Sequence, residues 1–235
     1  MKSQLNKDRD MFFIFKRKMP MKKIHFQSLF MIFFMGAVMI TTAARGNNLP
    51  DSIPKGWKAP VNKPPDLIIG IDTTVKHSGK ASGIIQRPLA LKPSTGHVTM
   101  MQSIVADGFR NKRVRLTVFA RSKEVESGAY FFFQANGTDT ILTYANTGSN
   151  MIYETNEWTR YQITLDVPEA AVKMEFGVKM APGQGTIWVD DFNLEVVDQN
   201  IPSDDWVVPR KLRMAVTKWK YQPNTKAMNL GFEDR

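Results

Sequence analysis

Short runs of alternating apolar and polar residues, separated by turn-forming residues, are the feature that most constrains the fold of this chain. In the clearest run, polar neighbours alternate with Val114, Leu116, Val118 and Ala120, and comparable runs recur between Asp66 and Asp198. A period of two residues is typical of a β-strand with one buried face, and no apolar period of 3.6 residues persists here for three turns. Eight or nine such strands without a long helix predict an all-β fold, an antiparallel β-sandwich or barrel.

The first 44 residues are organised like a secretory signal peptide. Through Ala44, eight lysines and arginines against two aspartates supply +6 of the formal net charge of +10, and the apolar run Leu29 to Ile40 precedes Thr42-Ala43-Ala44. This order of basic, apolar and small-residue regions predicts cleavage after Ala44. The 12-residue run is shorter than the roughly 20 residues that span a bilayer, and an uncleaved anchor helix is the alternative.

The predicted leader also indicates the cellular compartment and the class of partner. We expect an exported protein, periplasmic or secreted, without stable membrane insertion after cleavage. Because most of the basic excess belongs to the leader, nucleic acid is not an expected partner. Met19 and Met21 precede Lys22-Lys23, so translation starting at an internal methionine is a second possibility.

Composition argues against several kinds of catalysis. The 235-residue chain contains no cysteine, which excludes a disulfide scaffold, an Fe–S cluster, a Cys-ligated zinc site and a cysteine nucleophile. Of its three histidines, His25 lies in the leader, and neither His77 nor His97 is flanked by a nucleophile elbow or an orienting carboxylate. We therefore predict that the protein is not an enzyme.

Prolines mark the segments on either side of the predicted strands. Residues 45–65 contain five prolines and are expected to form an irregular lead-in. Residues 66–198 hold the predicted strands of one domain. Residues 199–235 are interpreted as a C-terminal linker or tail because Pro202, Pro209 and Pro223 interrupt them.

The last predicted strand changes faces at two adjacent carboxylates. In the stretch from Ile187 to Val196, the apolar positions are odd-numbered up to Val189 and even-numbered from Phe192. A strand changes faces in this way only with an extra residue, so a β-bulge is predicted at Asp190-Asp191. The two carboxylates are either part of a solvated kink or ligands of a hard cation such as Ca²⁺.

Four stretches resemble bacterial jelly-roll domains with the galactose-binding-like fold. They are Ile71 to Ser82, Asn111 to Ser122, Asn156 to Ala171 and Phe176 to Val197, in the same order as in that family, and the last contains Gly185-Thr186-Ile187-Trp188-Val189-Asp190-Asp191. Many members of the family are carbohydrate-binding modules, and others are accessory domains beside exported hydrolases. The resemblance implies an antiparallel jelly roll, and the ligand stays open because such folds host many functions.

The resemblance also implies a structural calcium site, with one departure from the family pattern. Family members open with Asn-x-x-Phe-Glu, whose glutamate joins the first aspartate of the last strand, here Asp190. In this chain the opening is Asn48-Leu49-Pro50-Asp51, and the motif occurs instead at Asn229 to Asp234. We interpret the late motif as the start of a lost second domain; the alternative is that the tail folds back and donates Glu233 to the Asp190 site.

Aromatic side chains on one strand predict the ligand-binding face. Tyr130, Phe132 and Gln134 are expected to point away from the core, and the resemblance places their strand on the concave sheet. Tyr144 and Arg121 complete the predicted ligand-binding set, and further outward residues on neighbouring strands are Arg115, Arg160 and Lys179. Rings stack on sugars while planar polar groups bind hydroxyls. Alternatively, Phe131-Phe132-Phe133 is a strand buried on both sides.

These expectations define two candidate functions. The first is a non-catalytic exported module that recognises a glycan through the concave sheet. The second is a structural accessory domain that packs against an exported hydrolase or envelope protein without binding sugar. Trp57, Trp158 and Trp188 lie at strand boundaries and are expected to cover the ends of the sandwich rather than to bind ligand.

Overall fold

Nine β-strands and one short 3-10 helix make up the regular structure of the residues that the computed structural model describes, which are 53–60, 67–88, 96–207 and 222–234. All of them belong to the unit Gly46–Arg235. The strands are β1 (Ile68–Asp72), β2 (Ser82–Arg87), β3 (Val98–Val105), β4 (Lys112–Asn136), β5 (Ile141–Asn146), β6 (Ile152–Val167), β7 (Lys173–Met180), β8 (Gly185–Val197) and β9 (Trp206–Val207), with the 3-10 helix at Gly148–Asn150. The predicted signal peptide lies outside the described residues. Within them, no helix is long and apolar enough to cross a membrane.

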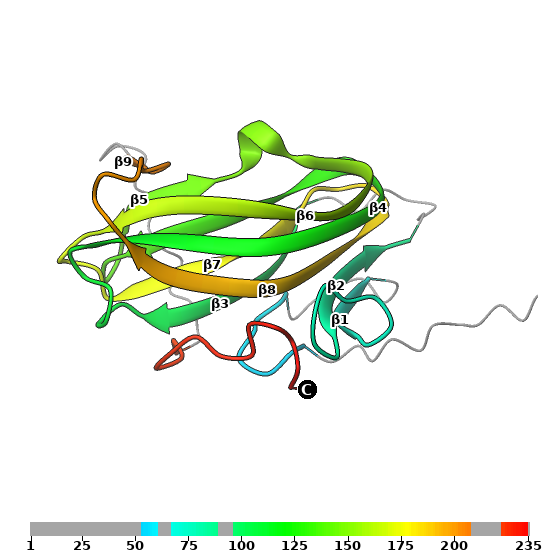
Figure 1. The fold of residues 1–235 in the computed structure, drawn as a ribbon, viewed down its shortest axis with the longest axis horizontal. Helices are drawn as coiled ribbons and strands as arrows, with labels where there is room; N and C mark the ends of the chain where they lie inside the picture. The colour runs from blue at the N-terminus through cyan, green and yellow to red at the C-terminus, as the bar shows by residue number, and fades with distance from the viewer. Residues whose placement is uncertain (1–52, 61–66, 89–95, 208–221, 235) are drawn as a thin grey trace, which may run out of the picture. The chain divides into compact units, whose positions relative to one another are not determined.

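The strands form two antiparallel layers that share β4 (Figure 1). Residues 112–123 of β4 pair with β6 and β8, and β8 continues through β2 to β1; we call this layer sheet 1. Residues 129–136 of β4 pair with β5 and β7, and β7 continues to β3 while β5 continues to β9; we call this layer sheet 2. The predicted all-β antiparallel sandwich is therefore confirmed.

The passage of β4 from one sheet to the other coincides with two left-handed residues. Glu124 has φ 53° and Gly128 has φ 92°. Backbone in this region bends a strand and interrupts its pairing, and the register between β4 and β6 shifts repeatedly between residues 120 and 129. The two halves of one strand thus face the core from opposite layers.

Alternate residues of both sheets fill the space between the layers. Phe131, Phe133 and Phe176 from sheet 2 are fully buried against Leu116 and Val189 from sheet 1. Fully burying one such large apolar side chain stabilises a fold by roughly 1.5–3 kcal/mol. The sequence has a period of two residues because alternate side chains of each strand enter this core.

The last part of the chain returns to the domain. Residues 53–60 and 222–234 lie beside each other along the edge of the sandwich (Figure 1), where the Trp57 indole N–H donates a 3.0 Å hydrogen bond to the Asn229 carbonyl. The ring of Phe232 is fully buried and stacks on Trp57 at a centroid distance of 4.8 Å. Asn224 also pairs with Ile104 of β3 in a parallel bridge.

This packing corrects two interpretations. Residues 199–235 are not simply a linker or tail. The ring of Phe232 belongs to the hydrophobic core cluster, so residues 222–234 pack on the domain and do not form a free connector. The motif at Asn229 to Asp234 folds back onto the domain, which is the second of the two alternatives. Glu233 contacts the loop at Lys80, however, and not Asp190 itself. Residues 208–221 lie outside the described residues.

Candidate functional site

The outer face of sheet 2 brings together four of the five predicted ligand-binding residues. Tyr130, Phe132 and Gln134 alternate along β4 and so project from the same face, away from the core that receives Phe131 and Phe133. Tyr144 of β5 lies directly opposite Gln134. Residues directly opposite in an antiparallel pair share a face, so the four side chains form one surface.

Neighbouring strands extend this surface with residues that the ligand prediction did not include. On β7, Lys179 is opposite Tyr130 and Glu175 is opposite Gln134. On β3, Ser103 is opposite Glu175. We define the outer face of sheet 2 by its outward-pointing residues, which are Thr99, Met101, Ser103, Tyr130, Phe132, Gln134, Asn136, Tyr144, Asn146, Lys173, Glu175, Gly177 and Lys179.

The floor of this face is a hydrogen-bonded polar network around Glu175. One carboxylate oxygen accepts a bond from the Lys173 ammonium at 2.8 Å. The other accepts the side-chain amides of Gln134 at 2.8 Å and Asn136 at 3.0 Å. Glu175 is only 2% exposed, and a buried carboxylate is retained at acceptable cost only when it is bonded in this way. The network fixes the Gln134 amide so that its carbonyl oxygen remains available as an acceptor.

Burial perturbs the titratable groups around the network. It raises the pKa of Tyr130 and of Tyr144, and the nearby Tyr130 hydroxyl raises the Tyr144 pKa further while a hydrogen bond with Asn146 lowers it. Burial lowers the pKa of Lys179, and the negative charge of Glu175 partly opposes this effect. Partly desolvated polar groups that converge on one surface are characteristic of binding sites.

One hydroxyl of this surface lacks a partner. The Ser103 hydroxyl is buried and has no hydrogen-bond partner among the described residues. Leaving a buried hydroxyl unpaired costs roughly 1–3 kcal/mol, so Ser103 lowers the stability of this part of the sheet.

Phe132 does not lie open on this face as predicted. Its side chain is 2% exposed, and the Lys179 ammonium lies 4.5 Å from the ring centroid. A cation over an aromatic face at this distance is an attractive cation–π contact. Phe132 therefore supports Lys179 rather than offering a ring to a ligand, and the alternative of a strand buried on both sides describes this position.

Arg121 does not belong to this surface. It lies in the half of β4 that forms sheet 1, opposite Trp188 of β8, and its guanidinium pairs with Glu157 at 3.1 Å. The physical reason is the passage of β4 between the layers, which puts Arg121 and Tyr130 on different sheets. Trp158 and Trp188 are also half-buried on sheet 1 rather than in the core, whereas Trp57 is buried as expected.

The predicted β-bulge is present at the second candidate site. Between Asn193 and Asp190 the register of β8 against β4 shifts by one residue, and Asp191 has φ 51°. The Asp190 carboxylate is fully buried and accepts the backbone N–H groups of His77, Ser78 and Asp191 at 2.8–3.1 Å. Burial raises the Asp190 pKa to about 6, against the opposing effect of these N–H donors.

The same loop receives two more carboxylates. Asp191 contacts the His77 ring nitrogen Nδ1 at 2.7 Å and accepts the Ser78 hydroxyl at 2.7 Å. Both oxygens of Glu233 accept the backbone N–H of Lys80. Glycine is required at position 79 because its φ is +56° and a Cβ would lie 1.9 Å from the Glu233 carboxylate.

The hydrogen bonds at this loop compete with the calcium that the family resemblance implies. N–H groups point at the oxygens that a cation would need, and calcium takes six to eight oxygen ligands. Within the described residues, no group of three or more Asp, Glu or His side chains is arranged to hold a metal ion. Asp190 and Asp191 bind the 72–80 loop through hydrogen bonds instead.

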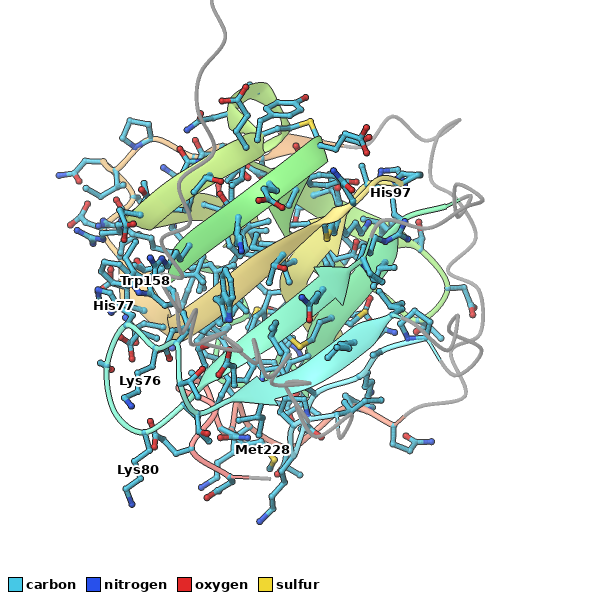
Figure 2. The ribbon with its side chains drawn as sticks, turned by 90° about the vertical axis from the view of Figure 1, so that its right-hand side faces the viewer. Lys76, His77, Lys80, His97, Trp158 and Met228 are labelled. Carbon is cyan, nitrogen blue, oxygen red and sulfur yellow. The ribbon has the colours of Figure 1, made fainter. Side chains whose placement is uncertain are left out.

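His77 and His97 have different surroundings. The His77 ring stacks on Phe119 at 3.8 Å and meets Trp158 edge-on at 5.5 Å. Figure 2 shows the labelled His77 and Trp158 together, well apart from His97. Ser78 bonds to Asp191 and not to the histidine ring, so the three side chains do not form a Ser-His-Asp relay. His97 is exposed and approaches the Tyr130 ring at 6.0 Å.

Sequence reasoning missed the polar half of the first site. Glu175 and Lys173 alternate on β7 with the core residues Met174 and Phe176, and Ser103 precedes the core residue Ile104. A glutamate between two buried positions of a strand is a usable signal, but the sequence does not tell which strand lies opposite it. Asn136 ends β4 next to a hairpin turn, which is closed by a 2.8 Å hydrogen bond from the Gly137 N–H to the Thr140 carbonyl.

Comparison with known proteins finds one sequence relative. No family model matches this sequence. A protein of Bacillus subtilis (strain 168), the uncharacterized HTH-type transcriptional regulator YbfP, is 34% identical over 159 residues, which are 67% of this chain and 53% of that protein. The chain thus spans about half the length of this relative.

Solved structures of similar fold include sugar-binding domains. A putative sugar-binding protein from Bacteroides thetaiotaomicron VPI-5482 aligns with a TM-score of 0.46 and 13% identity, over 62% of this chain and 90% of that one. The CBM22-1 xylan-binding domain from Paenibacillus barcinonensis Xyn10C gives 0.42 and 12%, over 63% and 90%. The enzymatically active domain of bacteriophage CBA120 tailspike protein 4 gives 0.48 and 13%, over 63% and 20%.

These likenesses concern the fold and carry no ligand or activity to this chain. The strand pairing itself shows that the described domain is an all-β antiparallel sandwich.

Proposed function

We propose that this chain is a non-catalytic, exported module that binds a carbohydrate through the outer face of sheet 2. Export rests on the leader, and carbohydrate as the ligand class rests on the family resemblance. The observation that carries the proposal is the joint presence on one face of two half-buried tyrosines, Tyr130 and Tyr144, and the fixed side-chain amide of Gln134.

The chemistry of these groups suits a sugar. A pyranose has an apolar C–H face that packs on a tyrosine ring, and hydroxyls that both donate and accept hydrogen bonds. The Gln134 carbonyl can accept from a sugar hydroxyl, and the Tyr130 hydroxyl can donate to one. A surface in which the polar groups are held by the Glu175 network before the ligand arrives loses little entropy on binding.

Affinity electrophoresis through gels that contain soluble polysaccharides tests the proposal. Tyr130→Ala should weaken binding by roughly 1–3 kcal/mol, the cost of losing one anchor of a binding site, without changing the melting temperature of the fold. Gln134→Ala should also weaken binding, but it should lower the melting temperature as well, because it removes a donor from the buried Glu175 carboxylate. Arg121→Ala is the matched control, since Arg121 lies on the same strand but on sheet 1. Wild-type protein that migrates unretarded through a broad panel would refute carbohydrate binding.

A second function, an accessory domain that packs against an exported hydrolase or envelope protein, is favoured by a different surface. The outer face of sheet 1 carries Phe119, Arg121 and Trp188 on adjacent strands, with Trp158 close by. Arginine and large aromatic residues are enriched in protein interfaces. This function predicts that the wild-type protein is not retarded in any polysaccharide gel. Retardation that is lost in Arg121→Ala and Trp158→Ala, with Tyr130→Ala unaffected, would instead indicate that a glycan binds to this face.

A further inference from the structure

The outer face of sheet 2 carries more positive than negative charge. Its rows contain two lysines, Lys173 and Lys179, and one carboxylate, Glu175. Lys58 adds a third cation close by, because the charges of Glu175 and Lys173 both act on its pKa, which burial lowers. A surface that was built only for neutral hydroxyls would not need this surplus.

The three ammonium groups differ in what they already contact. Lys173 is bonded to Glu175 at 2.8 Å, and Lys58 donates to the Gln222 carbonyl at 2.9 Å. The Lys179 ammonium lies over the Phe132 ring and makes no hydrogen bond or ion pair with any described residue. It therefore has three N–H donors to offer, at a position opposite Tyr130.

The location of Lys179 makes its charge effective. The side chain is half-buried, and Phe132 beneath it is 2% exposed, so the ammonium is held against an apolar surface. A charge in such a setting attracts an opposite charge more strongly than one in open water, because the surrounding dielectric is lower. On the opposite strand, the half-buried Tyr130 ring adjoins the exposed imidazole of His97 at the edge of the same surface.

Resting on the carbohydrate-binding function proposed above, we infer that the ligand is an acidic glycan whose uronic acid carboxylate is bound by Lys179 while the sugar ring packs beside Tyr130. The Gln134 end of the same face then receives hydroxyls of a further sugar unit of the same chain. Lys179 and Glu175 on β7, like Tyr130 and Gln134 on β4, lie four residues apart. This separation is about 13 Å, so the two ends of the face contact different sugar units of one chain.

Paired polymers test this inference directly. Polygalacturonate and alginate are compared with the same polymers after reduction of their carboxyl groups, by affinity electrophoresis of the wild-type protein. Retardation should be at least tenfold stronger in the acidic polymer of the pair that binds, since a hydrogen bond to a charged group is worth roughly 1.5–3 kcal/mol. Equal or stronger binding of the reduced polymers would overturn the inference and leave carbohydrate binding intact.

Variants assign the effect to one ammonium. Lys179→Met keeps the apolar stem over Phe132 and should lose the preference for acidic polymers, whereas Lys179→Arg should retain most of it. Lys226→Met removes an exposed lysine of the C-terminal segment and controls for general attraction between a basic protein and a polyanion. Equal losses in Lys179→Met and Lys226→Met would also overturn the inference, and absence of retardation in every acidic and neutral gel would refute both this and the proposed function.

Discussion

The ring of Phe232, three residues from the end of the chain, stacks on the indole of Trp57 at 4.8 Å with an interplanar angle of 28°. Phe192 of the last long strand completes the cluster, 4.9 Å from Trp57 and 6.1 Å from Phe232. The contact joins two irregular segments to the end of the core, so residues 53–60 and 222–234 act as parts of one hydrophobic unit.

Replacing Phe232 with alanine should therefore destabilise the whole domain. Removal of a fully buried phenylalanine costs about 3–5 kcal/mol, the sum of lost burial and the cavity left behind. Urea denaturation of Phe232→Ala should show this loss, whereas Val196→Ala, at a position that is 52% exposed, should change stability by less than about 0.5 kcal/mol. A Phe232→Ala variant as stable as the wild type would show that the C-terminal segment does not hold the domain together.

Gly79 and Glu233 provide a second test of the returning segment. Gly79→Ala should destabilise by about 1–3 kcal/mol, because alanine is strained at φ +56° and its Cβ would displace the Glu233 carboxylate. In a Glu233→Ala background the steric part of this penalty should disappear, which gives a measurable coupling energy. Gly108→Ala is the control, since a Cβ there meets no atom within 4 Å. Strict additivity of the two changes would show that Glu233 does not lie against the loop.

The fold and the bulge were predictable because both follow from local alternation. Side chains on a strand alternate with a period of two, so a change of parity between Val189 and Phe192 reveals an extra residue without knowledge of its partners. The same rule placed Tyr130 and Gln134 on the face opposite to the core. Each of these inferences needs only residues that are close in the sequence.

Alternation does not tell which sheet a strand joins. Arg121 and Tyr130 have the outward direction that was expected, but β4 changes sheets between them at Glu124 and Gly128. The contact between Trp57 and the C-terminal segment joins residues 172 positions apart, and no local pattern encodes such a pairing. The aromatic half of the candidate site was therefore predictable, and its polar half around Glu175, contributed by another strand, was not.

Calcium should leave the melting temperature of the protein unchanged. The carboxylates of Asp190, Asp191 and Glu233 accept N–H and O–H donors from the 72–80 loop, and a cation would have to displace these bonds. Differential scanning fluorimetry in EDTA and in millimolar calcium measures the effect. A cation bound only by the native state at a hundredfold excess over its dissociation constant would add about 2.7 kcal/mol, a shift that is readily detected. Stabilisation by calcium that is lost in Asp190→Ala would contradict the prediction.

Asp190 should make the stability of the domain depend on pH in a direction unusual for a carboxyl group. Burial raises its pKa from 3.8 to about 6 in the folded state, so between these values the folded protein binds a proton that the unfolded chain does not. The stability contributed by this proton is fully present below pH 3.8 and is lost as pH rises through about 6. The total decrease in the free energy of unfolding is roughly 2–3 kcal/mol. Asn at position 190 cannot titrate, so the free energy of unfolding of the wild type minus that of Asp190→Asn should fall between pH 4 and pH 7.5 in urea titrations containing EDTA. Asp139→Asn, which removes an exposed carboxylate, is the control. A difference that rises with pH instead would mean that the three N–H donors outweigh the cost of burying the charge.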